Sequence, residues 1–174
     1  MYVSGGWDMF HAGHVSILEK ARAMGDYLLV GIYNDGVVNS YRGGSHPVLN
    51  LNERVLSVLA NKYVNDIVID PPYIISKEMI AALNISLVVE GKCHEQKGTG
   101  VGNFRTTVAH RVPKEMGILR VVDSGTDFSM SNLLHRIKEN QCRLEKKVKK
   151  KMAAEAEHYA DKHGLEDYGA EIVA

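Results

Sequence analysis

Two histidines near the N-terminus offer the clearest chemistry in the sequence. His11 and His14 stand three residues apart, with Gly13 between them, where a strand-like segment gives way to a helix. The first turn of a helix presents unpaired backbone N–H groups and a positive dipole end, and both bind anions. Imidazole N–H groups can donate to oxygens that gain charge during phosphoryl chemistry. Gly5, Gly6 and Gly13 would let the backbone approach such an anion closely. The spacing predicts a polyphosphate site; the alternative is a pair that caps the helix or packs in the core.

The elements that must position these histidines alternate along the chain. Strands are expected at 2–6, 27–33, 67–69, 87–89 and 119–122. Helices are expected at 14–24, after Asn50, after Ser76 and from residue 129 or 130. A polar loop is expected over 34–47, and a long functional or disordered loop over 91–117. The alternation predicts an α/β fold with a doubly wound, five-stranded parallel sheet.

Three polar segments follow strand ends in this pattern, at 7–14, 90–92 and 123–131. In doubly wound sheets ligands bind beyond the carboxyl ends of the strands. We therefore expect these three segments to line a single crevice.

The helix after Asn50 has the strongest start signal. Asn50 and Glu53 have the spacing of a capping box, in which each side chain accepts from the other residue's backbone N–H. Its apolar side is expected to turn five residues inward: Val55, Leu56, Leu59, Ala60 and Tyr63. Ser76 is expected to cap the next helix. Inward residues are then Met79, Ile80 and Leu83, and in the last helix Leu133, Leu134 and Ile137.

Composition excludes several classes of function. Lys and Arg total 21 and balance 21 Asp and Glu, so no net field favours nucleic acid or a membrane. Cys93 and Cys142 are too few for a disulfide framework or a zinc cluster, which favours a reducing, cytoplasmic setting. No signal peptide and no apolar run long enough for a membrane span stand out. The strand-like start at Tyr2 suggests a domain cut from a longer chain.

The chain changes character near residue 140, so we expect a folded domain at 1–140 and a charged, helical or disordered tail at 141–174. The tail has a basic run, and one apolar residue recurs every four positions: Leu144, Val148, Met152 and Ala156. A solvated helix is the favoured interpretation. A helix that binds a membrane surface is the alternative, and the acidic stretch that follows weakens it.

Residues 5–14 read Gly-Gly-Trp-Asp-Met-Phe-His-Ala-Gly-His. This stretch resembles the signature of the H-x-G-H nucleotidyltransferases, and its Trp-Asp-x-Phe-His form is similar to their cytidylyltransferase branch. Further blocks agree in order and spacing: Tyr-Arg-Gly at 41–43, 46–60, Pro-Tyr at 72–73, Glu-Gly-Lys at 90–92, Asp-Ser-Gly at 123–125 and Ser-Met-Ser at 129–131. Together they resemble the ethanolamine-phosphate cytidylyltransferase family, and its second, C-terminal domain in particular, over residues 2 to about 140.

The resemblance implies a Rossmann-like nucleotidyltransferase fold and a reaction of CTP with phosphoethanolamine. The products would be CDP-ethanolamine and pyrophosphate, in phosphatidylethanolamine biosynthesis. Mg²⁺ is expected to accompany CTP, because it bridges phosphates, and no protein metal cage is visible in the sequence. Expected partners beyond the substrates are a second copy of the chain or a second cytidylyltransferase domain, with no nucleic acid.

The resemblance also implies roles for individual residues. His11 and His14 would donate to oxygens of the α-phosphate and the bridging oxygen, and Arg42 would clamp phosphate; these three are the expected catalytic residues. Asp8 would orient the loop or hold magnesium through water. Arg54 would reach into the crevice or pin the loop. Contacts with CTP or the acceptor are expected from Ser4, Gly5, Gly6, Trp7, Asp8, Phe10, Gly13, Arg54, Tyr73, Glu90, Gly91, Lys92, Thr126, Phe128, Ser129, Met130 and Ser131. Among these, Tyr73 would line the amine pocket by cation–π contact.

Two positions depart from the family pattern. Ser124 stands where an arginine is usual, and Glu90 stands where a histidine is usual before Gly-Lys. Arg105, Arg111 or Lys114 could replace the missing charge. The departures motivate an alternative function, a catalytically weakened CTP-binding regulatory domain of a two-domain enzyme. An adenylyltransferase is disfavoured by the 50–54 and 72–73 blocks, and phosphocholine stays open as the acceptor.

Overall fold

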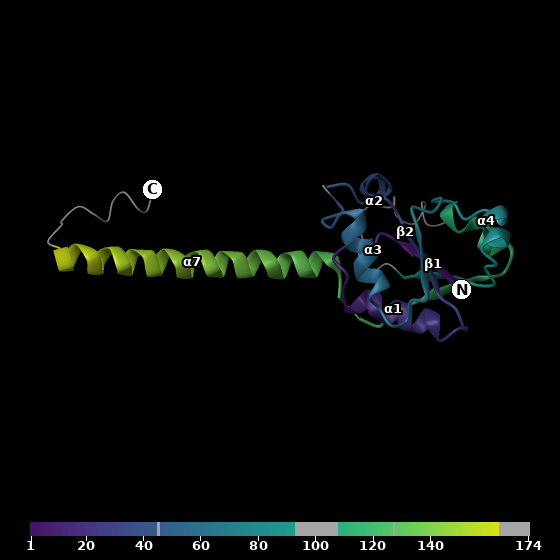
Figure 1. Cartoon of the computed structure of the whole chain (residues 1–174), viewed down its shortest axis with the longest axis horizontal. Coiled ribbons are helices and arrows are strands. Elements are labelled where there is room, and N and C mark those ends of the chain that lie inside the picture. The colour runs from purple at the N-terminus through teal and green to yellow at the C-terminus, as the bar shows by residue number, and fades with distance from the viewer. Residues whose placement is uncertain (45, 93–107, 127, 164–174) are drawn as a thin grey trace. The chain divides into compact units, whose positions relative to one another are not determined.

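The structure is a computed structural model of the 174-residue chain, and it describes residues 1–44, 46–92, 108–126 and 128–163. The chain divides into two compact units, Met1–Met130 and Ser131–Ala174 (Figure 1). Each unit is described by itself.

Five parallel strands form one sheet in the first unit, in the order β3-β2-β1-β4-β5. They are β1 (Tyr2–Gly5), β2 (Leu29–Ile32), β3 (Asp66–Ile69), β4 (Val88–Gly91) and β5 (Leu119–Val122). The chain builds outward from β1 through β2 to β3, then returns to place β4 on the other side of β1. The predicted doubly wound, five-stranded parallel sheet is confirmed. Its topological switch point lies between β1 and β4, where ligands of such sheets bind.

Helices cover both faces of this sheet (Figure 1). The first face packs against α1 (Ala12–Arg22) and α3 (Leu51–Leu59), through Ile17, Leu18 and Ala21 of α1 and Val58 of α3. The second face packs against α4 (Lys77–Ala82) and α6 (Arg111–Glu115), which contribute Ile80 and Val112. The three central strands β1, β2 and β4 therefore contribute apolar residues to both faces, as expected of a buried parallel sheet.

Two short helices lie in segments that the sequence predicted to be loops. In the expected polar loop, α2 runs from Asp35 to Arg42. Asn34 caps it by accepting from the Val37 N–H at 2.8 Å, and Val38 is its single buried residue. One buried residue leaves too weak an apolar period to predict a helix. In the same way α6 occupies part of the expected 91–117 loop, of which 93–107 lie outside the described residues.

The capping box of α3 is confirmed, but its predicted inner face is partly wrong. Asn50 Oδ1 accepts from the Glu53 N–H at 3.1 Å, and Glu53 Oε2 accepts from the Asn50 N–H at 2.8 Å. The fully buried residues are Arg54 and Val58, one helical turn apart, whereas three predicted inward residues, Leu56, Leu59 and Ala60, are exposed. The inner face of α3 therefore consists of residues 51, 54, 55 and 58. It differs from the prediction because the charged side chain of Arg54 is one of the buried residues.

The next helix follows its prediction more closely. Ser76 Oγ caps α4 by accepting from the Met79 N–H at 3.2 Å, as predicted. Ile80 is buried and Met79 is partly buried, as expected. Leu83 is 39% exposed instead of inward, because α4 ends at Ala82 and Leu83 is its C-cap residue.

The second unit consists, in its described part, of the helix α7 (Met130–His163), which begins in the last residue of the first unit. The predicted stripe of Leu144, Val148 and Met152 is exposed, and so is Ile137, which was expected to turn inward. Ala156 is buried within this unit. Among the described residues, no helix combines the length and apolar character needed to cross a membrane.

Candidate active site

His11 and His14 cap the first helix through one nitrogen of each ring. His11 is the N-cap residue of α1, and its Nδ1 accepts from the Gly13 N–H at 3.1 Å. The His14 Nδ1 in turn accepts from the His11 N–H at 3.3 Å. The two histidines therefore cap the helix, as the alternative interpretation expected. Capping uses only the Nδ1 atom of each ring.

The caps decide which ring nitrogens carry protons. A neutral imidazole that accepts at Nδ1 has its proton on Nε2, so both rings present an Nε2–H donor. The two rings stack with centroids 3.9 Å apart and an angle of 20° between their planes. Burial is the main cause that lowers the pKa of His14 to about 3, and the charges of His11 and Arg42 contribute to the same shift. His14 is therefore a neutral hydrogen-bond donor near pH 7.

Aromatic side chains hold the stacked imidazoles in place. Phe10 stacks on His14 at 5.5 Å between centroids, and Trp7 meets His14 edge-on at 5.3 Å. The Trp7 indole is buried and donates from Nε1 to the Gly31 carbonyl at 2.9 Å. Phe128 lies against the other ring, with 5.2 Å between its centroid and that of His11. Rings fixed on several sides are preorganised donors.

The loop that carries these rings is strained and tightly packed. Trp7 and Met9 have φ values of 53° and 48°, which residues with a side chain rarely adopt. A Cβ on Gly6 would stand 2.6 Å from the Tyr41 hydroxyl oxygen. A Cβ on Gly13 would stand 3.0 Å from the His11 ring and 3.2 Å from the Phe128 carbonyl oxygen. These contacts within the protein require the two glycines, whatever anion approaches them.

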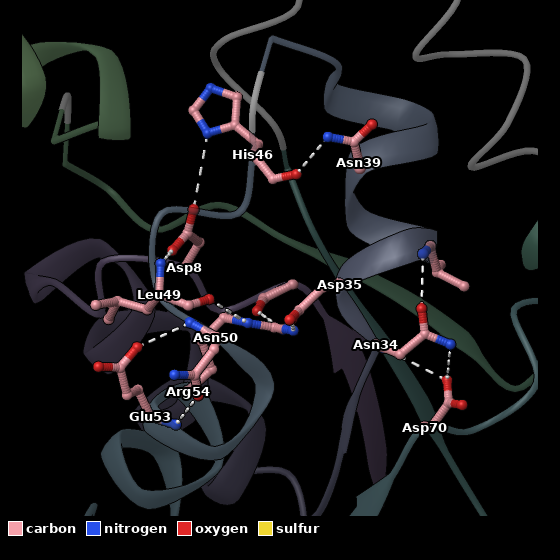
Figure 2. A network of polar contacts seen from close by, with 12 residues as sticks. Asp8, Asn34, Asp35, Asn39, His46, Leu49, Asn50, Glu53, Arg54 and Asp70 are labelled. Atoms are coloured by element: carbon pink, nitrogen blue, oxygen red, sulfur yellow. Dashed lines mark hydrogen bonds and ion pairs between the residues drawn. The ribbon is translucent and has the colours of Figure 1, made fainter.

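Asp8 joins this loop to the segment before α3 (Figure 2). Its side chain is buried, and its two carboxylate oxygens accept from the N–H groups of Val48 and Leu49 at 2.7 and 2.9 Å. The His46 Nδ1 lies 3.7 Å from Asp8 Oδ2. Of the two predicted roles for Asp8, these contacts favour orienting the loop over holding magnesium.

Arg54 is fully buried and ties three elements together (Figure 2). Its guanidinium donates to the Leu49 carbonyl at 3.1 Å, the Gly6 carbonyl at 2.6 Å and Asp35 Oδ1 at 2.6 Å. The guanidinium thus links α3, the histidine loop and the first residue of α2. Of the two predicted roles for Arg54, these contacts favour pinning the loop over reaching into the crevice.

Arg42 ends α2 on the exposed side of the site. Its charge contributes to the lowered pKa of His14, which places the guanidinium within electrostatic reach of the stacked rings. That position suits the predicted phosphate clamp, because a cation beside two neutral donors completes an anion site.

Tyr73 belongs to a cluster of phenol rings. The centroids of Tyr33 and Tyr73 are 5.4 Å apart, and those of Tyr41 and Tyr73 are 6.3 Å apart. The Ser4 and Tyr33 hydroxyl oxygens lie 2.8 Å apart. Burial raises the pKa of Tyr33 and of Tyr41, so both phenols are neutral. The sequence identified Tyr73 but not Tyr33, which ends an apolar run, nor Tyr41, although Tyr41 belongs to the Tyr-Arg-Gly block.

The loop after β5 is tied to α1, and two lysines contact this loop. The Ser124 carbonyl accepts from Ser16 Oγ at 2.6 Å and from Lys20 Nζ at 3.2 Å. The Lys92 Nζ lies 3.2 Å from Asp123 Oδ2. The sequence did not identify Lys20, because nothing in a helical surface lysine shows that a loop 103 residues later packs on it.

The other residues that the sequence placed at the site, or offered as replacements for the missing charge, have the following positions. Arg111 pairs with Glu115 at 3.6 Å on α6, and Arg105 lies outside the described residues. Glu90 Oε2 lies 3.7 Å from the His110 Nδ1, at the start of α6. Gly5 packs on the Trp7 ring, and Gly91 packs on α1. Thr126 donates its N–H to Ser124 Oγ. Ser129 directly precedes α7, Met130 is the first residue of that helix, and Ser131 belongs to the second unit. No group of three or more His, Cys, Asp or Glu side chains that could hold a metal occurs among the described residues.

Comparisons with known proteins identify cytidylyltransferases as relatives of this chain. The model of the cytidylyltransferase-like family matches residues 2–134. An ethanolamine-phosphate cytidylyltransferase of Arabidopsis thaliana is 43% identical over 164 residues, which are 93% of this chain and 38% of that protein. Proteins of the same name from Dictyostelium discoideum and Mus musculus are 39% and 35% identical over 89% of this chain, and over 42% and 38% of their own lengths. The chain therefore spans about two fifths of the length of these relatives.

Proposed function

The chain belongs to the cytidylyltransferase-like family, and from that premise we propose that it transfers a cytidylyl group from CTP to phosphoethanolamine. The products would be CDP-ethanolamine and pyrophosphate, in phosphatidylethanolamine biosynthesis. Three relatives that carry the name ethanolamine-phosphate cytidylyltransferase support this choice of substrates. The observation that carries the proposal is the pair of capped imidazoles, His11 and His14, with both Nε2–H donors at one helix N-terminus.

The reaction needs no general base. The attacking group is a phosphomonoester oxygen of the acceptor, whose second pKa is about 6, so it is already ionised at neutral pH. This oxygen attacks the α-phosphorus of CTP, the bond from that phosphorus to the bridging oxygen breaks, and pyrophosphate leaves in line. The protein has to hold two polyanions together and stabilise the charge that builds up on the transferred phosphoryl group.

His11 and His14 are placed to supply that stabilisation. Their Nε2–H groups would donate to oxygens of the α-phosphate and to the bridging oxygen. Because its pKa is lowered to about 3, His14 stays neutral in the free protein and acts as a donor, not as an acid. Arg42 would add a full positive charge on the exposed side.

The phenol cluster suits the amine end of the acceptor. Tyr33, Tyr41 and Tyr73 are phenol rings grouped near the carboxyl end of the sheet. The face of such a ring attracts an ammonium group. Tyr73 is therefore proposed to line the amine pocket, together with Tyr33 and Tyr41.

Magnesium is proposed to arrive bound to the triphosphate, where it offsets phosphate charge. The Asp8 oxygens accept from backbone N–H groups, so Asp8 is assigned no part in holding the metal. The proposed partner is a second copy of the chain or a second cytidylyltransferase domain, and the proposed location is the cytoplasm.

An assay of pyrophosphate release tests the proposal. The 174-residue chain is mixed with Mg²⁺, CTP or ATP, and phosphoethanolamine or phosphocholine. We expect pyrophosphate with CTP and phosphoethanolamine, together with CDP-ethanolamine in the product mixture. Tight CTP binding without pyrophosphate would indicate the regulatory domain instead, and turnover with ATP but not CTP would overturn the choice of nucleotide.

A further inference from the structure

Glu90 is a carboxylate at the switch point of the sheet that the mechanism above leaves unused. The ladder between β1 and β4 pairs Tyr2 with Val88 and Val3 with Val89. Ser4 and Glu90 are the next residues along the two strands. Both therefore stand where the two strands open into the crevice in which ligands of doubly wound sheets bind.

The Glu90 side chain lies on the face of the sheet that α4 and α6 cover. Val3 and Val89 belong to the core on the opposite face, and successive strand residues alternate between faces. The contact with His110 agrees with this direction, because His110 is the N-cap residue of α6 and its Nδ1 lies 3.7 Å from Glu90 Oε2. The carboxylate is turned toward α6, not toward the imidazoles at the start of α1.

Hydroxyl groups and phenol rings occupy the same face beside Glu90. Ser4 directs its hydroxyl to Tyr33, and the Tyr33 ring lies against Tyr73. The Tyr2 hydroxyl is buried on this face and has no hydrogen-bond partner within the described residues. Glu90 itself is only 22% exposed, so its charge is partly withdrawn from water. A partly desolvated carboxylate attracts a cation and repels phosphate.

We propose that Glu90 binds the ammonium group of the acceptor and makes the site selective for a primary amine. This inference rests on the proposed function. An acceptor with phosphate at one end and ammonium at the other would present each charge to its complement, the phosphate to Arg42 and the ammonium to Glu90. A primary ammonium can donate hydrogen bonds to the carboxylate, whereas a trimethylated one cannot. Glu90 therefore favours phosphoethanolamine over phosphocholine.

Calorimetric binding of phosphoethanolamine, with a non-reacting CTP analogue present, tests this assignment. Ethyl phosphate serves as a matched probe, because it has the phosphate but no ammonium. Glu90→Gln keeps the side-chain shape and removes the charge, and Glu115→Gln is the control, because Glu115 is an exposed carboxylate on α6. We expect Glu90→Gln to weaken phosphoethanolamine binding about 10- to 100-fold, since charge-assisted hydrogen bonds are lost. Phosphocholine binding should weaken less, and ethyl phosphate binding should not weaken.

Several outcomes would overturn the assignment. They are equal weakening of phosphoethanolamine and ethyl phosphate by Glu90→Gln, no weakening at all, or the same weakening by Glu115→Gln. The wild-type chain gives a test without any variant, since it must bind phosphoethanolamine at least about tenfold more tightly than ethyl phosphate. Binding that depends on Glu90 but yields no pyrophosphate would refute the proposed function alone. Pyrophosphate release with binding indifferent to Glu90 would refute this inference alone.

Discussion

Replacing Arg54 by methionine separates the two roles that its sequence position allows. The guanidinium is fully buried and donates to the carbonyls of Gly6 and Leu49 and to Asp35. In Arg54→Met both carbonyls lose a donor, and each loss costs about 1–3 kcal/mol when the group stays buried. The Asp35 carboxylate is 49% exposed and is hydrated again in the variant, so the loss of the ion pair adds little to the destabilisation. We expect the free energy of unfolding to fall by about 2–6 kcal/mol, the sum of the two carbonyl losses.

Urea unfolding followed by tryptophan fluorescence measures this loss. The chain has a single tryptophan, Trp7, which is buried in the loop that Arg54 pins, so the signal reports on the first unit. Arg111→Met is the control, because that guanidinium is 74% exposed and its removal should leave stability close to the wild-type value. A stability loss under about 1 kcal/mol, combined with a tenfold or greater loss of CTP affinity, would refute this account and place Arg54 on the nucleotide.

Two further predictions concern the same loop, and a third concerns the phosphate group of the acceptor. Gly6→Ala should cost about 1–3 kcal/mol of unfolding free energy in urea titrations, because its Cβ would stand 2.6 Å from the Tyr41 hydroxyl oxygen, and adding Tyr41→Phe should restore much of it. His14 takes up a proton near pH 6.5 when unfolded but only near pH 3 when folded, so the unfolded state binds more protons between these values. Stability should therefore fall as pH drops below about 6.5, by about 1.4 kcal/mol per pH unit, and His14→Gln should flatten this slope in melts at stepped pH. The acid limb of kcat/KM should follow the second phosphate pKa of the acceptor, about 6, and move with an acceptor of different phosphate pKa; a limb that stays in place would point to a protein group instead.

The strands and the start of α3 could be predicted because their signals are local. Continuous apolar runs indicate strands buried on both faces, and Asn50 with Glu53 indicates a helix start through side chains three residues apart. The position of the two histidines together at a helix start could be predicted for a similar reason. His11 and His14 act within one helical turn, so their spacing alone indicates what they can bind together.

The positioning network could not be predicted, because its contacts join residues far apart in sequence. Arg54 lies 48 residues after Gly6, whose carbonyl it binds. From sequence alone, a charged residue in a helix is expected to lie on the surface or to contact a ligand, and only the fold shows that it is buried. Lys20 could not be identified for the same reason, because its Nζ donates to the distant Ser124 carbonyl. The inner face of α3 was predicted wrongly at Leu56 because apolar periodicity gives no sign that the core receives an arginine instead.

Turnover by His11→Asn tests most directly whether the imidazoles act on substrate or only cap a helix. Asparagine is among the best N-cap residues and its side-chain oxygen can accept from the Gly13 N–H, but it has no equivalent of the Nε2–H donor. We predict a chain that melts close to the wild-type temperature and releases pyrophosphate about 10²–10³ times more slowly from CTP and phosphoethanolamine. Turnover within about threefold of wild type would contradict the account, because a lost transition-state donor costs far more than that, and His11 would then be a cap and nothing more.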